Sequence, residues 1–298
     1  PTDADALACM KGSDVIIALH NCYVDLHQVD SIVKQAGGIS VSIIAAILSG
    51  LPFRIEDGYW LDPSSSRFII TESEKEWVKS NLSDSLSCTI IDGISRYRAT
   101  GQIGECPRPS LDDQYLPKDL PRYREPISLL DGGAFEGTIY QDFATYYSVK
   151  EYFAFEPDDL NFKKLSSYTY GAEPTVLLPL GLSNASEKLS FSGGNGMGSA
   201  VDKNGSITVQ CISLDQSFPN IRPNIVKLDI EGSELKALIG MKKIIKRHRP
   251  SLCISVYHRP EDLVDITHLI LSWELDYSLH LRVHEHNCFG LVLYARPI

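Results

Sequence analysis

The chain has 298 residues, of which 43% are hydrophobic and 22% are charged, and its formal net charge is −10. These values are ordinary for a folded globular protein and argue against a disordered or fibrous one. The negative charge would repel a polyanion, and no basic groove interleaved with aromatic residues is visible, so we expect no nucleic-acid partner. No apolar run reaches the roughly 18 residues of a membrane helix, no signal peptide opens the sequence, and the seven cysteines form no CxxC pair. We therefore expect a cytoplasmic protein with no membrane association.

Residues 1–110 are predicted to form a smaller N-terminal α/β accessory domain. The apolar runs 14–21 and 39–48 predict strands, and the helical spacing of hydrophobic residues within 25–38 predicts a helix between them. A second helix is predicted within 71–84, where Thr71 is a candidate N-cap before an acidic first turn. No ligand motif occurs in this part, so we expect an accessory domain or a homo-oligomer contact.

Residues 111–298 are predicted to form the catalytic domain. The segment 106–126 is rich in Pro, Asp and Tyr, which indicates a linker or a covering loop at the boundary. After it, strand and helix patterns alternate, which predicts a mostly parallel sheet with helices on both faces. The predicted strands are 127–131, 152–157, 175–182, 225–230 and 251–258. The runs 277–285 and 289–298 are too close for a crossover helix and predict a terminal antiparallel hairpin.

The segment LLDGGAFEG at residues 129–137 is the first candidate ligand site. Asp131 ends a predicted strand, and Gly133 and Gly137 lie in the turn that opens the next helix, where glycine permits close approach of a ligand. The pattern is DxGxxxG, whereas a dinucleotide site would show GxGxxG around a pyrophosphate. Without a phosphate to bind, a carboxylate at this position suits the cationic amino group and sulfonium of S-adenosylmethionine (SAM). The alternative is that these residues only form a turn.

Glu156 supports the ligand interpretation. It ends the second predicted strand 19 residues after Gly137, which is the position where an acid binds the ribose hydroxyls of an adenosine ligand. A surface glutamate before a proline is the alternative. The end of the third strand is predicted to pass near the adenine. The predicted cofactor-binding residues are Asp131, Gly132, Gly133, Ala134, Phe135, Gly137, Glu156, Pro157, Gly181, Leu182, Ser183 and Asp229.

The glycine-rich segment 192–206 resembles a phosphate-binding loop but lacks GK followed by Ser or Thr. We interpret it as a flexible hairpin connection, with a mobile flap as the functional alternative.

Two carboxylates, Asp229 and Glu231, lie at the carboxyl end of the fourth predicted strand, at the sheet edge where ligands bind in open α/β folds. They could orient SAM, accept a proton from a substrate hydroxyl, or bind a divalent cation, and no dedicated metal site is predicted. Glu231 could instead cap the helix predicted at 233–247. The basic run 242–249 complements the end of that helix and is interpreted as structural.

His258 ends the fifth predicted strand and is the leading candidate for a general base. A neutral imidazole can take a hydroxyl proton as a methyl group arrives. A lone histidine is often only a hydrogen-bonded residue, and that alternative stays open. The predicted catalytic residues are thus His258, Asp229 and Glu231.

Taken in order, these motifs resemble the FkbM family of SAM-dependent methyltransferases. The matching pieces run from residue 129 to 295 and include LDGGAFEG, FEPD, LGLSN, SLD at 213–215, the stretch from VKLDIEGSE to YHRPEDL, and the closing LYA. The resemblance implies a class I methyltransferase (Rossmann-like) sheet with a terminal antiparallel hairpin. It also implies methyl transfer from SAM to a hydroxyl of a saccharide or natural product.

Two other functions are weighed against an O-methyltransferase, besides methylation of nitrogen on the same scaffold. One is a SAM-binding module without catalysis that serves assembly. The other is an NAD-dependent oxidoreductase, which the absent GxGxxG and the terminal hairpin disfavour.

Overall fold

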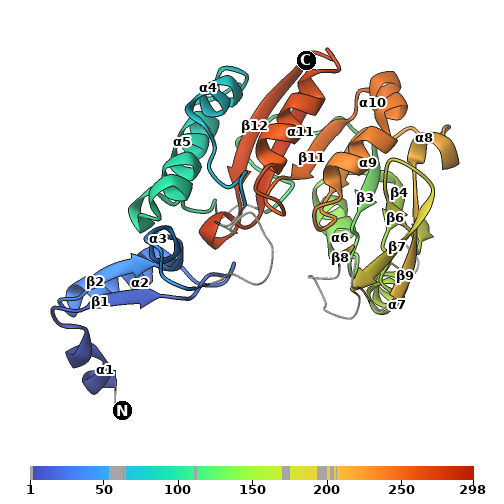
Figure 1. The fold of residues 1–298 in the computed structure, drawn as a ribbon. Coiled ribbons are helices and arrows are strands. Elements are labelled where there is room, and N and C mark those ends of the chain that lie inside the picture. The colour runs from blue at the N-terminus through green and yellow to red at the C-terminus, as the bar shows by residue number, and fades with distance from the viewer. Residues whose placement is uncertain are drawn as a thin grey trace. The chain divides into compact units, whose positions relative to one another are not determined.

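The computed structural model describes residues 3–53, 63, 65–110, 113–169, 175–192, 200–201, 205 and 207–298. Figure 1 shows the helices and strands. Their bounds in chain order are α1 Asp3–Met10, β1 Asp14–Ile17, α2 Leu26–Gln35, β2 Ile39–Ser42, α3 Ile43–Leu48, α4 Glu72–Ser80, α5 Ser85–Thr100, η1 Ile103–Glu105, β3 Ile127–Gly132, α6 Thr138–Tyr146, β4 Val149–Phe155, α7 Asp159–Tyr168, β5 Thr175–Leu178, β6 Gly181–Leu182, β7 Glu187–Ser192, β8 Ala200–Val201, β9 Ile207–Ile212, α8 Leu214–Ser217, β10 Ile225–Leu228, α9 Glu234–Gly240, α10 Lys242–His248, β11 Ser251–Ser255, α11 Asp262–Leu271, β12 Tyr277–Val283, η3 His286–Cys288 and β13 Leu291–Pro297.

The chain forms two compact units. The first comprises Pro1–Gln114, Tyr257–Val264 and His280–Val292, and the second comprises Tyr115–Val256, Asp265–Leu279 and Leu293–Ile298. The predicted domains, residues 1–110 and 111–298, are each continuous in sequence, whereas these units group residues by their contacts in space. The predicted domain boundary therefore stays a prediction. None of the helices in the described part of the chain is long and apolar enough to cross a membrane.

After helix α1, which was not predicted from the sequence, the first unit has the predicted strand, helix and strand. β1 and β2 are parallel, and α2 between them buries Leu26 and Val33. The expectation that residues 39–48 form one strand is wrong, because only Ile39–Ser42 is extended and α3 follows directly. The Ser42 side chain accepts a hydrogen bond from the Ala45 N–H, so a hydroxyl inside the apolar run starts the helix.

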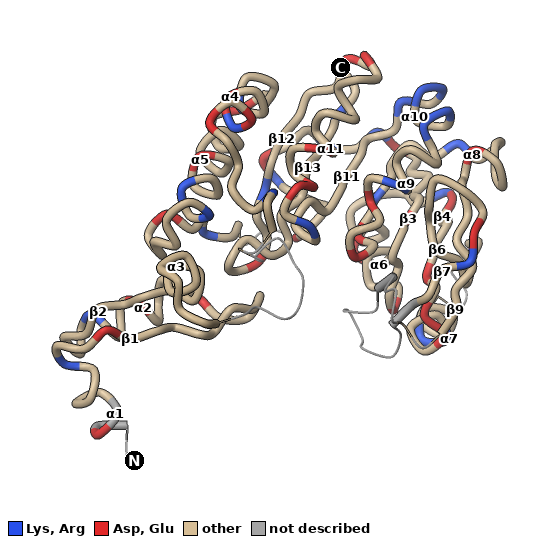
Figure 2. Tube along the Cα trace, viewed as in Figure 1, with Lys and Arg blue, Asp and Glu red and all other residues tan. Residues whose placement is uncertain are grey.

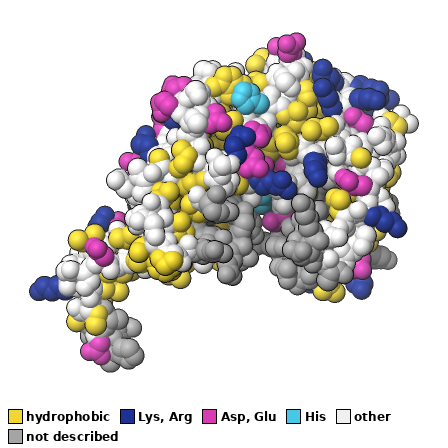
Figure 3. All heavy atoms as spheres, viewed as in Figure 1, with side chains coloured by type: hydrophobic (Ala, Val, Ile, Leu, Met, Phe, Trp, Pro, Cys, Tyr) yellow, Lys and Arg dark blue, Asp and Glu magenta, His cyan; other side chains and the backbone are white. Residues whose placement is uncertain are grey.

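Hydrophobic side chains around this pair of strands reach the surface of the first unit (Figure 3). Leu19, Tyr23 and Ile39 are 53%, 79% and 61% exposed. An apolar surface of this kind is typical of a contact region.

Helix α4 begins where the sequence predicts. The Thr71 hydroxyl accepts from the Glu74 N–H and the Glu74 carboxylate accepts from the Thr71 N–H, which completes a capping box. The following helix α5 is absent from the sequence-based prediction. It ends at Gly101, which adopts φ 66° in the left-handed region.

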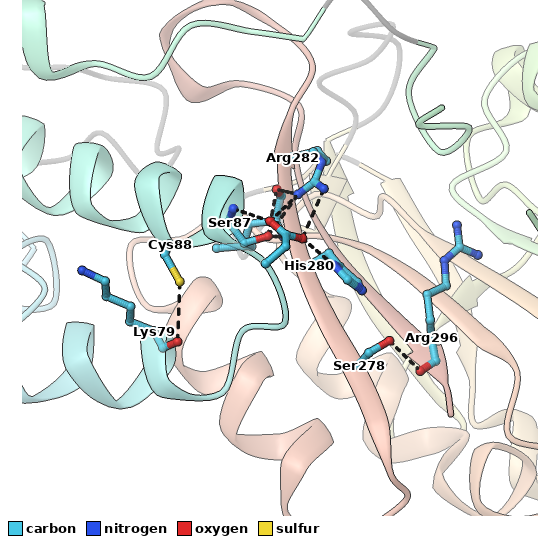
Figure 4. Close-up of polar contacts among 9 residues, drawn as sticks. Lys79, Ser87, Cys88, Ser278, His280, Arg282 and Arg296 are labelled. Atoms are coloured by element: carbon cyan, nitrogen blue, oxygen red, sulfur yellow. Dashed lines mark hydrogen bonds and ion pairs between the residues drawn. The ribbon is translucent and has the colours of Figure 1, made fainter. Parts of the chain in front are cut away.

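Asp84 joins α5 to strand β12 within the first unit. Its carboxylate caps the helix by accepting from the Ser87 N–H at 2.7 Å, and lies 2.5 Å from Nδ1 of His280 and 3.2 Å from Nη2 of Arg282. Figure 4 shows Ser87, His280 and Arg282 converging on this point. Burial would raise the pKa of Asp84, but the hydrogen bonds from His280, Ser87 and Arg282 outweigh burial and hold that pKa well below its usual range.

The large sheet has seven strands in the order β12, β13, β11, β10, β3, β4, β5. The pairs from β11 to β5 are parallel, as predicted for strands separated by helices. β12 and β13 are neighbours, and their connection is closed by backbone bonds from His284 to Gly290 and from Glu285 to Phe289, which confirms the terminal hairpin.

Both faces of β4 are covered. Tyr140 of α6 packs against Tyr152 with ring centroids 5.0 Å apart, and Phe218, which follows α8, lies 6.3 Å from Phe155. Residues 152 and 155 point to opposite faces of a strand, so helices enclose the sheet as expected. The predicted helix 233–247 is two helices, α9 and α10, that meet at Met241. Basic residues gather on α10 (Figure 2). Lys246, Arg247 and His248 lie in its last turn, as predicted for a helix end, whereas Lys242 and Lys243 begin α10 because the predicted helix is divided at Met241.

The predicted third strand, 175–182, is also corrected. Residues Thr175–Leu178 form β5 of the large sheet, whereas Gly181–Leu182 form β6 of a separate four-stranded sheet in the order β6, β9, β7, β8. A hairpin is predicted between residues 186–191 and 207–215, and the corresponding strands β7 and β9 are antiparallel, which confirms it. Of the segment 192–206, where the flap interpretation falls, residues 193–199, 202–204 and 206 lie outside the described residues.

We predict that Asp84→Ala lowers the free energy of unfolding by about 2–4 kcal/mol, because α5 loses its cap and a buried Arg282 loses its partner. The depressed pKa means that this stabilisation is present at neutral pH and is lost as the pH falls below about 4. Urea unfolding followed by circular dichroism measures both effects. Asp30→Ala, which removes an exposed pair with Lys34, is the matched control and should cost less than about 0.5 kcal/mol.

Candidate cofactor and active site

The ends of four parallel strands form one edge of the large sheet. Gly132 of β3 is in register with Leu228 of β10 on one side and with Phe155 of β4 on the other. Leu228 is in turn in register with Ile254 of β11. Because the strands are parallel, the residues that follow them emerge side by side at the carboxyl edge, where ligands bind in such sheets. These residues are Gly133, Glu156, Asp229 and Ser255.

The glycine turn after β3 owes its shape to close packing. Gly133 has φ 72°, and a Cβ there would lie 1.9 Å from the Asp229 carbonyl oxygen. Only glycine fits between the two strand ends. Gly137, with φ 89°, precedes α6 and provides no side-chain cap, so the first turn of α6 is not covered by a capping side chain. The predicted residues Ala134 and Phe135 lie in this same turn, and Gly132 is the last residue of β3.

Glu156 bridges the turn and the next loop. Its carboxylate accepts hydrogen bonds from the Phe135 N–H and from the Asp158 N–H, both at 2.9 Å, and the side chain is buried. Burial raises the pKa of Glu156 to about 7, although the two N–H donors act in the opposite direction. Pro157 follows it and is half-buried. A strand-tip carboxylate is therefore placed beside the glycine turn, as predicted.

Asp131 is completely buried and bonded within the protein. One carboxylate oxygen lies 2.9 Å from Nζ of Lys227, and the other accepts from the Tyr152 hydroxyl at 2.8 Å. Burial and the neighbouring Asp131 raise the pKa of Tyr152, which remains a hydrogen-bond donor. Direct contact of Asp131 with a cofactor stays a prediction, and what the structure shows is an anchor for Lys227.

Lys227 ties the glycine turn to β10. Its ammonium donates to the carbonyl oxygens of Gly132 at 3.2 Å and Gly133 at 2.6 Å, besides its ion pair with Asp131. Burial would lower the pKa of Lys227, but the carboxylates of Asp131 and Asp229 raise it above its ordinary value. The ammonium is therefore charged, and all three of its donors are used.

Asp229 and Glu231 lie just beyond β10, which ends two residues earlier than the predicted strand. The Asp229 carboxylate accepts from the Tyr115 hydroxyl at 2.8 Å. Glu231 adopts φ 53° and precedes α9 by three residues. The first turn of the helix holds Glu234 instead, whose carboxylate accepts from the Ile230 N–H at 2.8 Å. Glu234 is therefore the acid in the first turn of α9, and a capping role for Glu231 stays an alternative.

The predicted adenine-side residues belong to β6 and the residue after it. The Leu182 side chain lies 2.9 Å from where a Cβ on Gly132 would be, so this segment does approach the glycine turn. Gly181 leaves room for the Cys211 sulfur, which a Cβ would meet at 2.6 Å. Ser183 is buried, and its hydroxyl donates to Glu187 at 2.7 Å.

His258 belongs to the first unit and is described within it. Its side chain is buried, and its ring centroid is 4.2 Å from that of Tyr257. Helix α5 holds this segment through Arg98, a buried guanidinium that donates to the Pro260 carbonyl oxygen at 2.7 Å. A catalytic role for His258 stays a prediction.

Sequence reasoning missed the side chains that organise this edge. A lysine within a fully buried four-residue strand was the available signal for Lys227, because buried lysines are almost always paired. No comparable signal identifies Tyr152 as the partner of Asp131. Tyr115 was noted only as part of a covering loop.

The residues of this edge fit an adenosine-bearing cofactor. The buried Glu156 carboxylate, which interacts with the backbone of the turn, is an acceptor suited to vicinal ribose hydroxyls. Gly133 and Gly137 give the turn its left-handed backbone, which places the Phe135 N–H against this carboxylate.

Comparison with known proteins agrees with this arrangement. Residues 131–279 match the family model described as the Methyltransferase FkbM domain. Over 131 residues the chain is 35% identical to the hexuronic acid methyltransferase AglP of Haloferax volcanii, a match that covers 41% of this chain and about half, 54%, of that protein. The crystal structure of the methyltransferase FkbM from Methylobacillus flagellatus KT superposes with a TM-score of 0.74 at 22% identity, over 90% of this chain and 70% of that one. That structural likeness confirms the fold.

We predict that Gly133→Ala destabilises the protein far more than Gly12→Ala. Both glycines have φ 72°, but a Cβ on Gly12 meets nothing within 4 Å. The control should cost about 1–2 kcal/mol for its backbone angle, whereas the added contact with the Asp229 carbonyl should bring the cost at Gly133 above about 3 kcal/mol. Urea unfolding of the two variants measures the difference. Equal losses would show that the backbone angle alone selects glycine at position 133.

Proposed function

Because the chain belongs to the FkbM methyltransferase family, we propose that it is a SAM-dependent O-methyltransferase that acts on a hydroxyl of a saccharide. The observation that carries the proposal is Glu156, a buried carboxylate at the tip of β4 that is bonded to the glycine turn after β3. That pairing supports binding of an adenosine moiety at the carboxyl edge.

Bound SAM supplies an activated methyl group for direct displacement by the acceptor oxygen. The protein contributes alignment of the reactants and exclusion of water, which together can provide about 7 kcal/mol or more. In this proposal Glu156 and the glycine turn hold the cofactor, while Asp229 and Glu231 supply carboxylates at the reacting end. His258 is the proposed base for the hydroxyl proton.

The acceptor class is proposed from the sequence similarity to a relative of known name. The relative from Haloferax volcanii is named a hexuronic acid methyltransferase, so a hexuronic acid is the first acceptor to test. The cytoplasm is the proposed setting, which the seven cysteines support because all of them are free thiols. Self-association through the exposed apolar surface of the first unit, with Leu19, Tyr23 and Ile39, is proposed as the oligomer contact.

Calorimetric titration of the protein with SAM and with NAD tests the cofactor. We expect SAM to bind. Asp131→Ala should lower the affinity for SAM because it releases Lys227, and Glu156→Ala should lower it because it removes the acceptor for the ribose hydroxyls. Binding of NAD in place of SAM would refute the proposal.

Methyl transfer is then measured with SAM carrying a labelled methyl group and a set of sugars. The set pairs glucuronic and galacturonic acid and their methyl glycosides with glucose and galactose. Labelled product from the acids supports the proposed acceptor class. A protein that binds SAM but labels no sugar would refute the saccharide acceptor and leave the cofactor assignment standing.

We predict that the affinity for SAM rises as the pH increases through about 7. The ionised Glu156 carboxylate accepts ribose hydroxyls better than the protonated acid, and its pKa of about 7 places the change between pH 6 and 8. If only the ionised form binds, the dissociation constant falls about tenfold across this window. Calorimetry in Glu156→Gln should show a flat profile. Glu151→Gln, at the other end of the same strand, should keep the wild-type dependence.

A further inference from the structure

Tyr115 lies in the segment that precedes β3 and is almost completely buried, at 2% exposure. All of its polar groups are bonded. Its N–H donates to the Tyr294 hydroxyl at 3.0 Å, its carbonyl oxygen accepts from the Tyr123 hydroxyl at 2.6 Å, and its own hydroxyl donates to Asp229 at 2.8 Å. The segment is thus fixed at this residue from three directions.

The backbone of Tyr115 is in the left-handed region, with φ 69°. A residue with a large side chain adopts this conformation only where the surroundings impose it, and such residues gather at functional sites. Here the imposed conformation brings a side chain from the connecting segment to the carboxyl edge of the sheet. The contacts of this side chain show which part of the tyrosine, the ring or the hydroxyl, is used there.

The ring and the hydroxyl of Tyr115 have separable contacts. The ring lies 5.6 Å from Nζ of Lys227, the residue that ties the glycine turn to β10. A phenylalanine would keep this ring contact and both backbone bonds. Only the hydroxyl requires tyrosine, and it reaches the Asp229 carboxylate, with the Ser255 hydroxyl a further 3.5 Å contact.

We propose that Tyr115 is a positioning residue for methyl transfer, whose hydroxyl fixes the orientation of the Asp229 carboxylate at the reacting end of the site. The inference rests on the proposed function. Asp229 follows β10 directly and its backbone abuts Gly133, so the direction of its carboxylate is set by side-chain contacts, of which the bond from Tyr115 is one. A hydrogen bond from a rigidly held phenol restricts that rotation.

The test compares Tyr115→Phe with Tyr277→Phe in the full chain. Tyr277 is a matched control, because its hydroxyl also donates a 2.8 Å bond, to the Pro250 carbonyl oxygen at the start of β11, away from the carboxyl edge. For each variant the dissociation constant for SAM is measured by calorimetry, and kcat and KM are measured with the sugar that the wild type methylates. Circular dichroism establishes that each variant is folded.

We expect Tyr115→Phe to leave the SAM dissociation constant and the acceptor KM within about threefold of wild type and to lower kcat at least about tenfold. Tyr277→Phe should leave all three unchanged. If the hydroxyl acts through Asp229, adding Tyr115→Phe to Asp229→Asn should change kcat less than about twofold further.

These measurements distinguish the positioning role of Tyr115 from the proposed methyltransferase function. A wild type that binds SAM and methylates a sugar, together with a Tyr115→Phe variant of undiminished kcat, refutes the positioning role alone. Additive losses in the double variant refute it as well, since the hydroxyl would then act independently of Asp229. A wild type that neither binds SAM nor transfers a methyl group overturns the proposed function and this inference with it.

Discussion

The buried ion pair between Lys227 and Asp131 is the interaction on which the carboxyl edge of the sheet depends. Taking both charges out of water is unfavourable unless they are paired and every remaining donor and acceptor is satisfied. Here the ammonium uses its other two donors on the carbonyl oxygens of Gly132 and Gly133, and Tyr152 satisfies the second carboxylate oxygen. The glycine turn is therefore held in place by charge as well as by packing.

Local patterns predicted much of the fold correctly. The strand at 127–131 and the helix after Thr71 were found because a run of apolar residues or a capping pair is complete within a few positions. The terminal hairpin followed from a connection too short for a helix. Glu156 was identified for the same reason, since its spacing from the glycine turn is visible in the sequence alone.

The predictions were wrong where hydrophobicity alone did not show which sheet or helix an apolar segment belongs to. The run 39–48 contains both a strand and a helix, and the boundary depends on one hydroxyl, that of Ser42. The run 175–182 is divided between two sheets. Helix α5 was not predicted because its buried face includes Ser87, Gly93 and Arg98, which interrupt the hydrophobic pattern. Such residues gain their partners only in the folded protein, as Arg98 does at the Pro260 carbonyl oxygen. Tyr115 was missed for the same reason, because its partners Tyr294 and Asp229 are distant in the sequence.

The residues of the carboxyl edge are far apart along the chain. The bond from Lys227 to Gly132 spans 95 positions, and that from Tyr115 to Asp229 spans 114. Such high contact order delays formation until the intervening chain has been ordered, because loop closure costs entropy before these contacts can form. A partly synthesised or partly folded chain thus has no such edge. Any ligand that binds there selects the native state alone and adds about 2.7 kcal/mol to its stability when present at a hundred times its dissociation constant.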